Sequence, residues 1–302
     1  MARLRIVPLT LAALLVLWCY QPSAAQEAGP LRTTLSARAF QQGEVVRLDV
    51  TCSCQIAGAT ATVFGHDVPL FPVSGSAAWR GLIGIDVTAA PGKYQVRIAA
   101  DRTGEPALTT TSELVVAVKR FPTRRLTVEP RFVDPPAAEV ARIQDEARRL
   151  QTLFDTITPR LLWQGKIHLP VAAEPSGSFG MRSVFNGQAR SPHGGTDFPS
   201  PAGAPIAAPA SGTIVLAEDL YFTGNTVVID HGLGLYSLMA HLSKFEVKGG
   251  RYRVAGTGDR IGGGHRTGHR PASALDGPSR RRADRSAVAR GHCHDGRLMS
   301  SL

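Results

Sequence analysis

The chain is short of cysteine, charge and long apolar runs. It has 302 residues, of which four are cysteines and 19% are charged. Its only long apolar run lies at the N-terminus, which excludes a protein that crosses a membrane several times. Ordinary apolar content and the lack of a dominant low-complexity tract exclude collagen-like, coiled-coil and disordered classes. The length suits one large domain or two ordinary ones, each with its own core.

The N-terminal run has the organisation of a secretory signal peptide. Two arginines precede an apolar stretch at 6–19, and Ser23-Ala24-Ala25 supply the small residues of a cleavage site. Bulky residues just before Cys19 argue against a lipoprotein. We therefore expect residues 1–25 to be removed on export. This would place the protein in the periplasm or cell envelope, with no stable membrane anchor.

Few cysteines are available for disulfides in such a compartment. Without the signal peptide, Cys52, Cys54 and Cys293 remain. Cys52 and Cys54 are expected on one strand, where a bridge between them would be strained. We therefore predict that no disulfide framework holds the fold together.

The net charge of +10 is concentrated at the C-terminal end. Residues 265–302 contain eight arginines and three aspartates, and the signal peptide adds two arginines, so residues 26–264 carry only +3. A nucleic-acid-binding function would therefore depend on the tail alone. We predict no nucleic-acid partner.

Two β-rich regions flank one helical segment. Over residues 26–120 short β-rich runs alternate with turn residues, which predicts an immunoglobulin-like β-sandwich. A linker follows at 121–165, and apolar residues three and four apart within it predict a helix at 136–157, packed between the domains. Residues 166–264 are again β-rich and punctuated by glycine, which predicts a second, all-β domain. The fold class is therefore mainly β.

The second domain contains a short motif with metal-binding character, His193-Gly194-Gly195-Thr196-Asp197. The two glycines allow a tight turn that can bring the imidazole and the carboxylate toward one metal ion. These are ligands suited to zinc. By itself the pattern is weak, because a histidine in a turn followed by a capping aspartate is common.

Further short motifs surround this one in a fixed order over 65 residues. They are Phe179-Gly180-Met181-Arg182, Phe185-Asn186-Gly187, Pro201-x-Gly203, Gly224-Asn225, Asp230-His231-Gly232 and His241-Leu242-Ser243. Together they resemble the lysostaphin-type (LytM-domain) zinc endopeptidases, which cut peptide cross-links in bacterial peptidoglycan. A β-sandwich and a helix before the catalytic domain resemble exported proteobacterial members, so the resemblance covers most of residues 27–264.

The resemblance implies roles for particular residues. His193 and Asp197 would be Zn²⁺ ligands, and His241 would be the catalytic histidine that orients water or stabilises the oxyanion. Asn225 and Arg182 would not be catalytic: they would be structural or would line the substrate groove, where peptidoglycan stem peptides bind.

Other residues of the motifs have structural interpretations. We expect His231 to be structural. Gly212, Gly224 and Gly232 are expected in turns that need a positive φ.

The sequence departs from the family after about Gly262. The family continues with a His-Leu-His-Trp segment that holds the third zinc ligand, whereas this chain has Ser-Ala-Leu-Asp in the corresponding stretch. When synonymous codons are chosen freely for residues 272–276, reading them one nucleotide later permits His-Leu-His-Trp. The hypothesis is that the residues after about Gly262 are out of frame, so that 265–302 form an aberrant, disordered tail. His294, within His292-Cys293-His294, is the in-chain rival for the third ligand, and we regard it as an accident of composition.

The function expected from the resemblance is zinc-dependent hydrolysis of peptide bonds in peptidoglycan, with activity of this chain in doubt because a ligand is missing. The alternative is a degenerate LytM-type regulator that binds and activates a cell-wall amidase, with divisome proteins as further partners. The retention of His193, Asp197 and His241 favours the enzyme.

Overall fold

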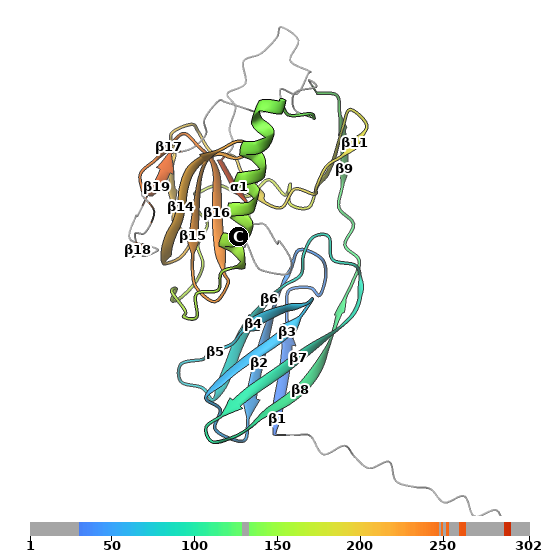
Figure 1. The fold of residues 1–302 in the computed structure, drawn as a ribbon, viewed down its shortest axis with the longest axis vertical. Coiled ribbons are helices and arrows are strands. Elements are labelled where there is room, and N and C mark those ends of the chain that lie inside the picture. Colours follow the sequence, from blue (N-terminus) through green and yellow to red (C-terminus); the bar gives the residue numbers. More distant parts are fainter. Residues whose placement is uncertain are drawn as a thin grey trace, which may run out of the picture.

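The computed structural model describes residues 30–128, 133–247, 249, 252–253, 260–263 and 287–290. Within these residues the chain forms two β-rich domains and one long helix (Figure 1). The prediction of a mainly β protein is confirmed. No helix in this part of the chain is long and apolar enough to cross a membrane. The predicted signal peptide lies outside the described residues.

The first domain is a sandwich of two four-stranded sheets. One has the order β1-β2-β6-β5 and the other β4-β3-β7-β8. Strand β2 shows why they pack face to face: Val46, Leu48 and Val50 are fully buried, whereas the residues between them face outward. The strand bounds are Leu31–Ser36 (β1), Val45–Cys52 (β2), Gly58–Val63 (β3), His66–Pro69 (β4), Phe71–Pro72 (β5), Ala78–Gly84 (β6), Gly92–Arg102 (β7) and Glu105–Val116 (β8).

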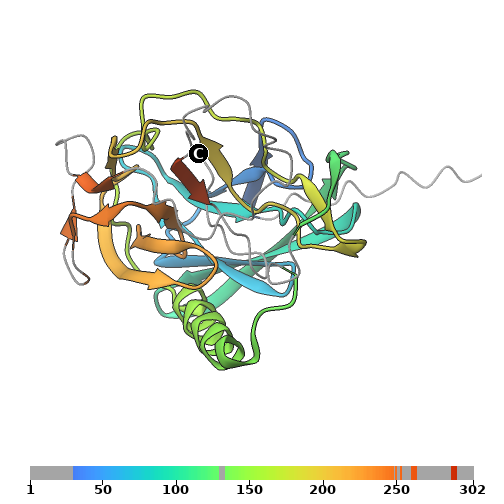
Figure 2. The ribbon, with the colours of Figure 1, turned by 90° about the horizontal axis from the view of Figure 1, so that it is seen from above.

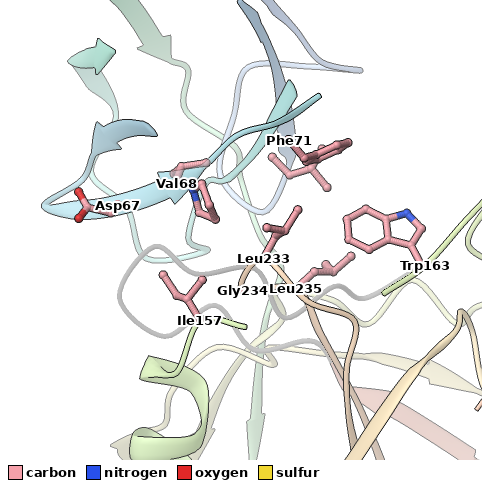
Figure 3. Close-up of a pocket in the computed structure, with 10 residues that line it drawn as sticks. Asp67, Val68, Phe71, Ile157, Trp163, Leu233, Gly234 and Leu235 are labelled. Atoms are coloured by element: carbon pink, nitrogen blue, oxygen red, sulfur yellow. The ribbon is translucent and has the colours of Figure 1, made fainter. Parts of the chain in front are cut away.

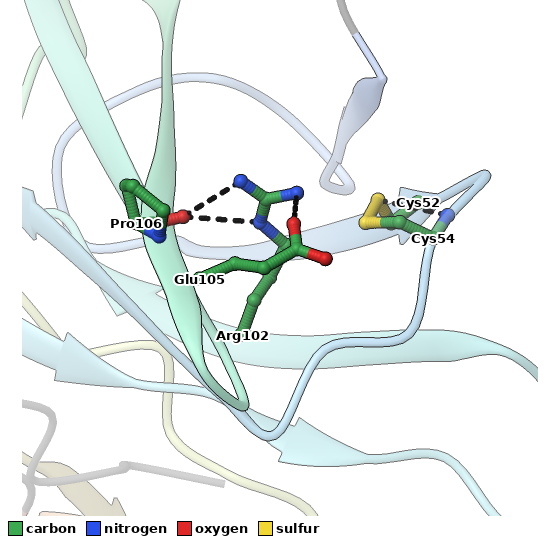
Figure 4. The surroundings of a disulfide bond; sticks show 5 residues. All are labelled: Cys52, Cys54, Arg102, Glu105 and Pro106. Atoms are coloured by element: carbon green, nitrogen blue, oxygen red, sulfur yellow. Dashed lines mark hydrogen bonds and ion pairs between the residues drawn. A yellow bond between two sulfur atoms is a disulfide. The ribbon is translucent and has the colours of Figure 1, made fainter.

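A disulfide joins Cys52 to Cys54, contrary to the expectation that strain would keep them apart. Cys52 ends β2 and the chain bends immediately afterwards, so the two residues do not share one straight strand. Their Cα atoms are 5.0 Å apart, within the usual range for a bridge. Figure 4 shows the disulfide beside the β7–β8 turn, where Arg102 bonds to the carbonyl of Pro106.

Helix α1 (Ala137–Asp155) matches the predicted span, but its packing differs from the prediction. It lies on the outer face of the second domain's sheet rather than between the domains (Figures 1 and 2). Phe154 packs edge-on against Tyr236, with ring centroids 5.5 Å apart. Glu146 of this helix is buried, and its carboxylate accepts hydrogen bonds from the side chain of Arg142 and from the backbone N–H of Tyr221.

The second domain is built on a six-stranded sheet of order β12-β20-β16-β15-β14-β18, with a three-stranded sheet β13-β19-β17 beside it. Its central strands are almost completely buried, because α1 covers one face and a second apolar cluster covers the other. The bounds are Thr196–Phe198 (β12), Pro205–Ala207 (β13), Gly212–Leu220 (β14), Gly224–Asp230 (β15), Tyr236–Leu242 (β16), Lys244–Phe245 (β17), Tyr252–Arg253 (β18), Arg260–Gly263 (β19) and Ala287–Arg290 (β20).

Strand β20 lies within the segment predicted to be a disordered tail. It pairs antiparallel with both β12 and β16, so Val288 is opposite Asp197 on one side and Ala240 on the other. The structure therefore differs from the sequence prediction at these four residues. The rest of 265–302 lies outside the described residues.

A third small sheet joins the linker to the second domain. Strand β9 (Thr123–Leu126) pairs in parallel with β10 (Arg182–Phe185), which in turn forms a hairpin with β11 (Gln188–Ala189). The start of the predicted linker is therefore part of a sheet (Figure 1).

The two domains also meet through an apolar pocket (Figure 3). Phe71 of the sandwich faces Trp163 of the second domain edge-on, with centroids 5.9 Å apart. Leu82, Ile157 and Leu233 line the same pocket. These contacts bury apolar side chains of both domains against each other.

Candidate metal centre

His193 is fixed by backbone pairing with the segment that leads into β10. Its N–H donates to the carbonyl of Met181 at 2.9 Å, and its carbonyl accepts from the N–H of Gly180 at 2.8 Å. Four residues later Asp197 lies in β12, and its carbonyl accepts from the N–H of Ser176. The loop between these residues thus brings the two predicted ligands to one place.

The side chains of His193 and Asp197 face each other. Nε2 of His193 is 3.5 Å from Oδ1 of Asp197, and Nδ1 is 3.1 Å from the carbonyl oxygen of Ser178. A carbonyl can only accept, so the neutral ring carries its proton on Nδ1 and directs the Nε2 lone pair toward the carboxylate. Two electron-pair donors that face each other suit a cation between them. A backbone carbonyl bound to the other ring nitrogen is the usual support of a metal-binding histidine.

Ser178 orients both members of this pair. Besides its carbonyl bond to the ring, its hydroxyl donates to Oδ2 of Asp197 at 2.7 Å, which leaves Oδ1 directed toward His193. The sequence does not predict a role for Ser178 in this site. Its type and its distance from the motif gave no signal, since a serine 15 residues before a histidine has no recognisable pattern.

His241 occupies a bulge in the central sheet. Asn225 pairs with Leu242 and Val227 with Met239, so one residue of β15 is opposite two of β16, Ala240 and His241. The extra residue breaks the alternation of faces, because Met239 and Leu242 both belong to the same buried cluster. His241 is thereby turned out of that core, and it has a φ of +56°, which is uncommon for a residue with a side chain.

The neighbours of His241 explain how the bulge is held. Its N–H donates to the carbonyl of Thr223 at 2.8 Å. A Cβ on Gly224 would be 4.0 Å from Nδ1 of His241, so the ring lies above this glycine. Asn225 is buried, and its side-chain amide donates to the carbonyl of Ser243, which ties β15 to the turn after β16. Its role in substrate binding stays a prediction.

The remaining predicted site residues are placed as follows. Arg182 is exposed on β10, one residue after the Met181 carbonyl that binds His193. His294 lies outside the described residues. Within the part of the chain that the structure describes, no group of three or more His, Cys, Asp or Glu side chains could hold a metal ion. His193 and Asp197 therefore fit two positions of a zinc site, and no third position is found among these residues.

His231 has the structural role that the sequence analysis expected. It is 1% exposed, with Nδ1 2.7 Å from the carbonyl of Ser211 and Nε2 2.8 Å from the hydroxyl of Ser237. Burial lowers the pKa of His231, although the Ser211 hydrogen bond and the charge of Asp230 oppose this shift.

The turn glycines were predicted with mixed success. Gly224 and Gly232 have φ values of +57° and +84° as expected. Gly212 does not have a positive φ, so that prediction was wrong. Its role is steric, because a Cβ there would lie within 2.9 Å of atoms of Asp230, Ile229 and His231.

The β domain, with a facing histidine and aspartate at its motif, has the character of a metallopeptidase domain. Residues 191–280 match the model of Peptidase family M23. A crystal structure described as a peptidase M23 from Pseudomonas aeruginosa has 24% sequence identity and a TM-score of 0.62. The structural match covers 86% of this chain and 92% of the Pseudomonas chain, so the two proteins share a fold over both domains.

Two curated relatives match part of the chain. Peptidoglycan DD-endopeptidase ShyA of Vibrio cholerae is 40% identical over 77 residues, which are 26% of this chain and 17% of ShyA. Peptidoglycan DD-endopeptidase ShyB of the same organism is 33% identical over 81 residues, 24% of this chain and 19% of ShyB. The chain thus spans less than a fifth of the length of each of these relatives.

Proposed function

We propose that this protein is a zinc-dependent endopeptidase that hydrolyses peptide cross-links of bacterial peptidoglycan. The observation that carries the proposal is the facing pair of His193 Nε2 and Asp197 Oδ1, supported on both sides by Ser178, in a domain of family M23. The names of the two Vibrio relatives support peptidoglycan as the substrate.

The chain's own residues have distinct tasks in this proposal. His193 and Asp197 would hold the zinc ion, which when bound would polarise a scissile carbonyl and acidify water. His241, turned out of the core by the bulge, accepts or donates a proton at its imidazole during attack on the peptide bond. The third ligand comes from outside the described residues. In the frame-corrected sequence it is the second histidine of His-Leu-His-Trp.

The test compares the printed chain with a frame-corrected chain. Both are loaded with zinc and incubated with purified peptidoglycan, and the soluble products are separated and identified by mass. We expect cleaved cross-links from the frame-corrected protein and none from its His193→Ala variant. No release by the frame-corrected protein would contradict the proposal, and a stoichiometric amidase partner in a pull-down would favour the regulatory alternative.

We also propose that the protein acts in the periplasm or cell envelope, because residues 1–25 have the pattern of a signal peptide. Cell fractionation with mass determination of the mature N-terminus tests this. An uncleaved protein that fractionates with the cytoplasm would contradict it.

A further inference from the structure

The small sheet β9-β10-β11 carries an unusually one-sided set of charges. Residues 119–126 and 182–190 contain one lysine, five arginines and no acidic residue. The two segments are 55 residues apart in the sequence, and the parallel pairing of β9 with β10 brings them together. This concentration of positive charge is therefore a product of the fold.

Half of these cations have a partner. Lys119 is paired with Glu44 of the sandwich, Arg124 donates to the hydroxyl of Ser183, and Arg190 donates to the carbonyl of Val133.

The other three cations have no such partner among the residues that the structure describes. The side chains of Arg120, Arg125 and Arg182 are exposed, and none forms a hydrogen bond or ion pair with another described residue. Unpaired guanidinium groups on one surface repel one another, and a bound anion would relieve this repulsion.

The strand register places two of these arginines on one face. Thr123 is opposite Arg182, and Arg125 lies two residues after Thr123 on the same strand, so Arg125 and Arg182 share a face. The bond between Arg124 and Ser183, which are also opposite each other, is consistent with this register. From the strand spacing and rise, the Cα atoms of Arg125 and Arg182 are about 8 Å apart.

The start of β10 lies beside the candidate metal centre. Arg182 directly follows Met181, whose carbonyl binds the N–H of His193. The backbone of Arg182 therefore adjoins that of His193, and we infer that a peptide held at His193 and Asp197 extends toward the guanidinium groups of Arg125 and Arg182. Guanidinium groups bind carboxylates with two parallel hydrogen bonds, which makes arginine well suited to an acidic peptide.

The linker that carries Arg125 is firmly attached at this point. The ring of Phe121 packs edge-on against Phe179, with centroids 6.3 Å apart, and Lys119 lies over Phe121 at 5.3 Å. A Cβ on Gly180 would come within 2.9 Å of three carbons of the Phe121 ring, so only glycine permits this approach. The position of Arg125 relative to the metal centre is therefore fixed by packing.

We propose that Arg125 and Arg182 form a carboxylate-binding subsite that selects acidic peptide substrates. The proposal rests on the proposed function and adds a substrate feature, because it requires free carboxylates next to the bond that is cut. Peptidoglycan stem peptides carry such carboxylates unless they are amidated.

The test is a binding experiment that needs neither zinc nor hydrolysis. A fluorescent stem tetrapeptide with free carboxylates is titrated with the printed chain, and the same peptide with amidated side carboxyls is titrated in parallel. We expect the free peptide to bind at least tenfold more tightly, and Arg125→Gln or Arg182→Gln to weaken its binding by about tenfold each. Arg97→Gln, an exposed arginine on β7 of the sandwich, is the matched control and should change nothing.

Three outcomes would overturn the subsite. The first is equal binding of the free and amidated peptides. The second is a loss of affinity in Arg97→Gln equal to that in Arg125→Gln or Arg182→Gln. The third is displacement of the peptide by a short polyphosphate at the same charge concentration. The last would identify a general polyanion surface. If binding behaves as expected while the frame-corrected protein releases no products, the subsite stands and the proposed hydrolysis fails.

Discussion

Substitution of Gly180 tests whether the linker and the metal centre form one packed unit. Gly180→Ala places a Cβ within 2.9 Å of three carbons of the Phe121 ring, at a residue whose φ is +75°. The same residue bonds through its N–H to the carbonyl of His193. The substitution should therefore disturb the attachment of β9 and the position of His193, a proposed zinc ligand, together.

The cost has two parts that can be separated. Alanine at a positive φ costs about 1–2 kcal/mol, and overpacking against a ring adds about 1–3 kcal/mol. Gly177→Ala is the matched control, because Gly177 has a φ of +68° and nothing within 4 Å of its Cβ position. It should lose only the backbone part of the free energy of unfolding.

The assay is chemical denaturation of Gly180→Ala, Gly177→Ala, Phe121→Ala and the double variant Gly180→Ala/Phe121→Ala. Removal of the ring eliminates the clash, so the double variant should be more stable than the sum of the single effects by about 1–3 kcal/mol. Additive effects, or equal losses at Gly177 and Gly180, would refute the packing argument.

Four further outcomes are expected. Ser178→Ala removes the hydroxyl bond to the metal-facing carboxylate and should weaken zinc binding about tenfold in a competition titration with a chelating dye. Because burial lowers the pKa of His231, the unfolded chain binds this proton at higher pH than the folded chain does. The contribution of neutral His231 to the stability of the fold is thus complete above a pH of about 6.5, and it is lost as the pH falls toward the pKa of the folded state. His231→Gln should therefore reduce the slope of unfolding free energy against pH in that window by up to about 1.4 kcal/mol per pH unit. Replacement of Cys52 and Cys54 by serine should cost no more than about 2 kcal/mol in a denaturant titration, because the bridge closes a loop of only three residues. His241→Gly should be more stable than His241→Ala by about 1 kcal/mol, because glycine accepts the positive φ, and equal melting curves would contradict this.

The elements that could be predicted from sequence are those whose signal is local. The alternation of Val46, Leu48 and Val50 along β2, and the three-and-four spacing along α1, each follow from one face being buried. The burial of Glu146 could not be predicted from the helix pattern, because its partners, Arg142 and the backbone N–H of Tyr221, include one that lies 75 residues away. A buried carboxylate with remote partners has the same local pattern as an exposed one.

Strand β9 was missed for a related reason. Its sequence, Thr123-Arg124-Arg125-Leu126, has only one β-branched residue and no alternation of apolar and polar residues. It pairs in parallel with a strand about 60 residues further along the chain. The strand exists because Phe121 packs over Gly180 and positions the backbone for pairing. Tertiary packing, rather than intrinsic preference, therefore decides this segment.

The candidate site divides in the same way. His193 and Asp197 could be placed together from the sequence, because two glycines between them permit a turn. The orientation of His241 could not, because it depends on one residue of β15 being opposite two of β16. Had β16 continued its regular alternation, Met239 and His241 would share the core face and Leu242 would lie on the other. The bulge places Leu242 in the core instead and turns His241 out, so the backbone conformation of this one residue determines whether the histidine is a core side chain or lies outside the core, as the proposed function requires.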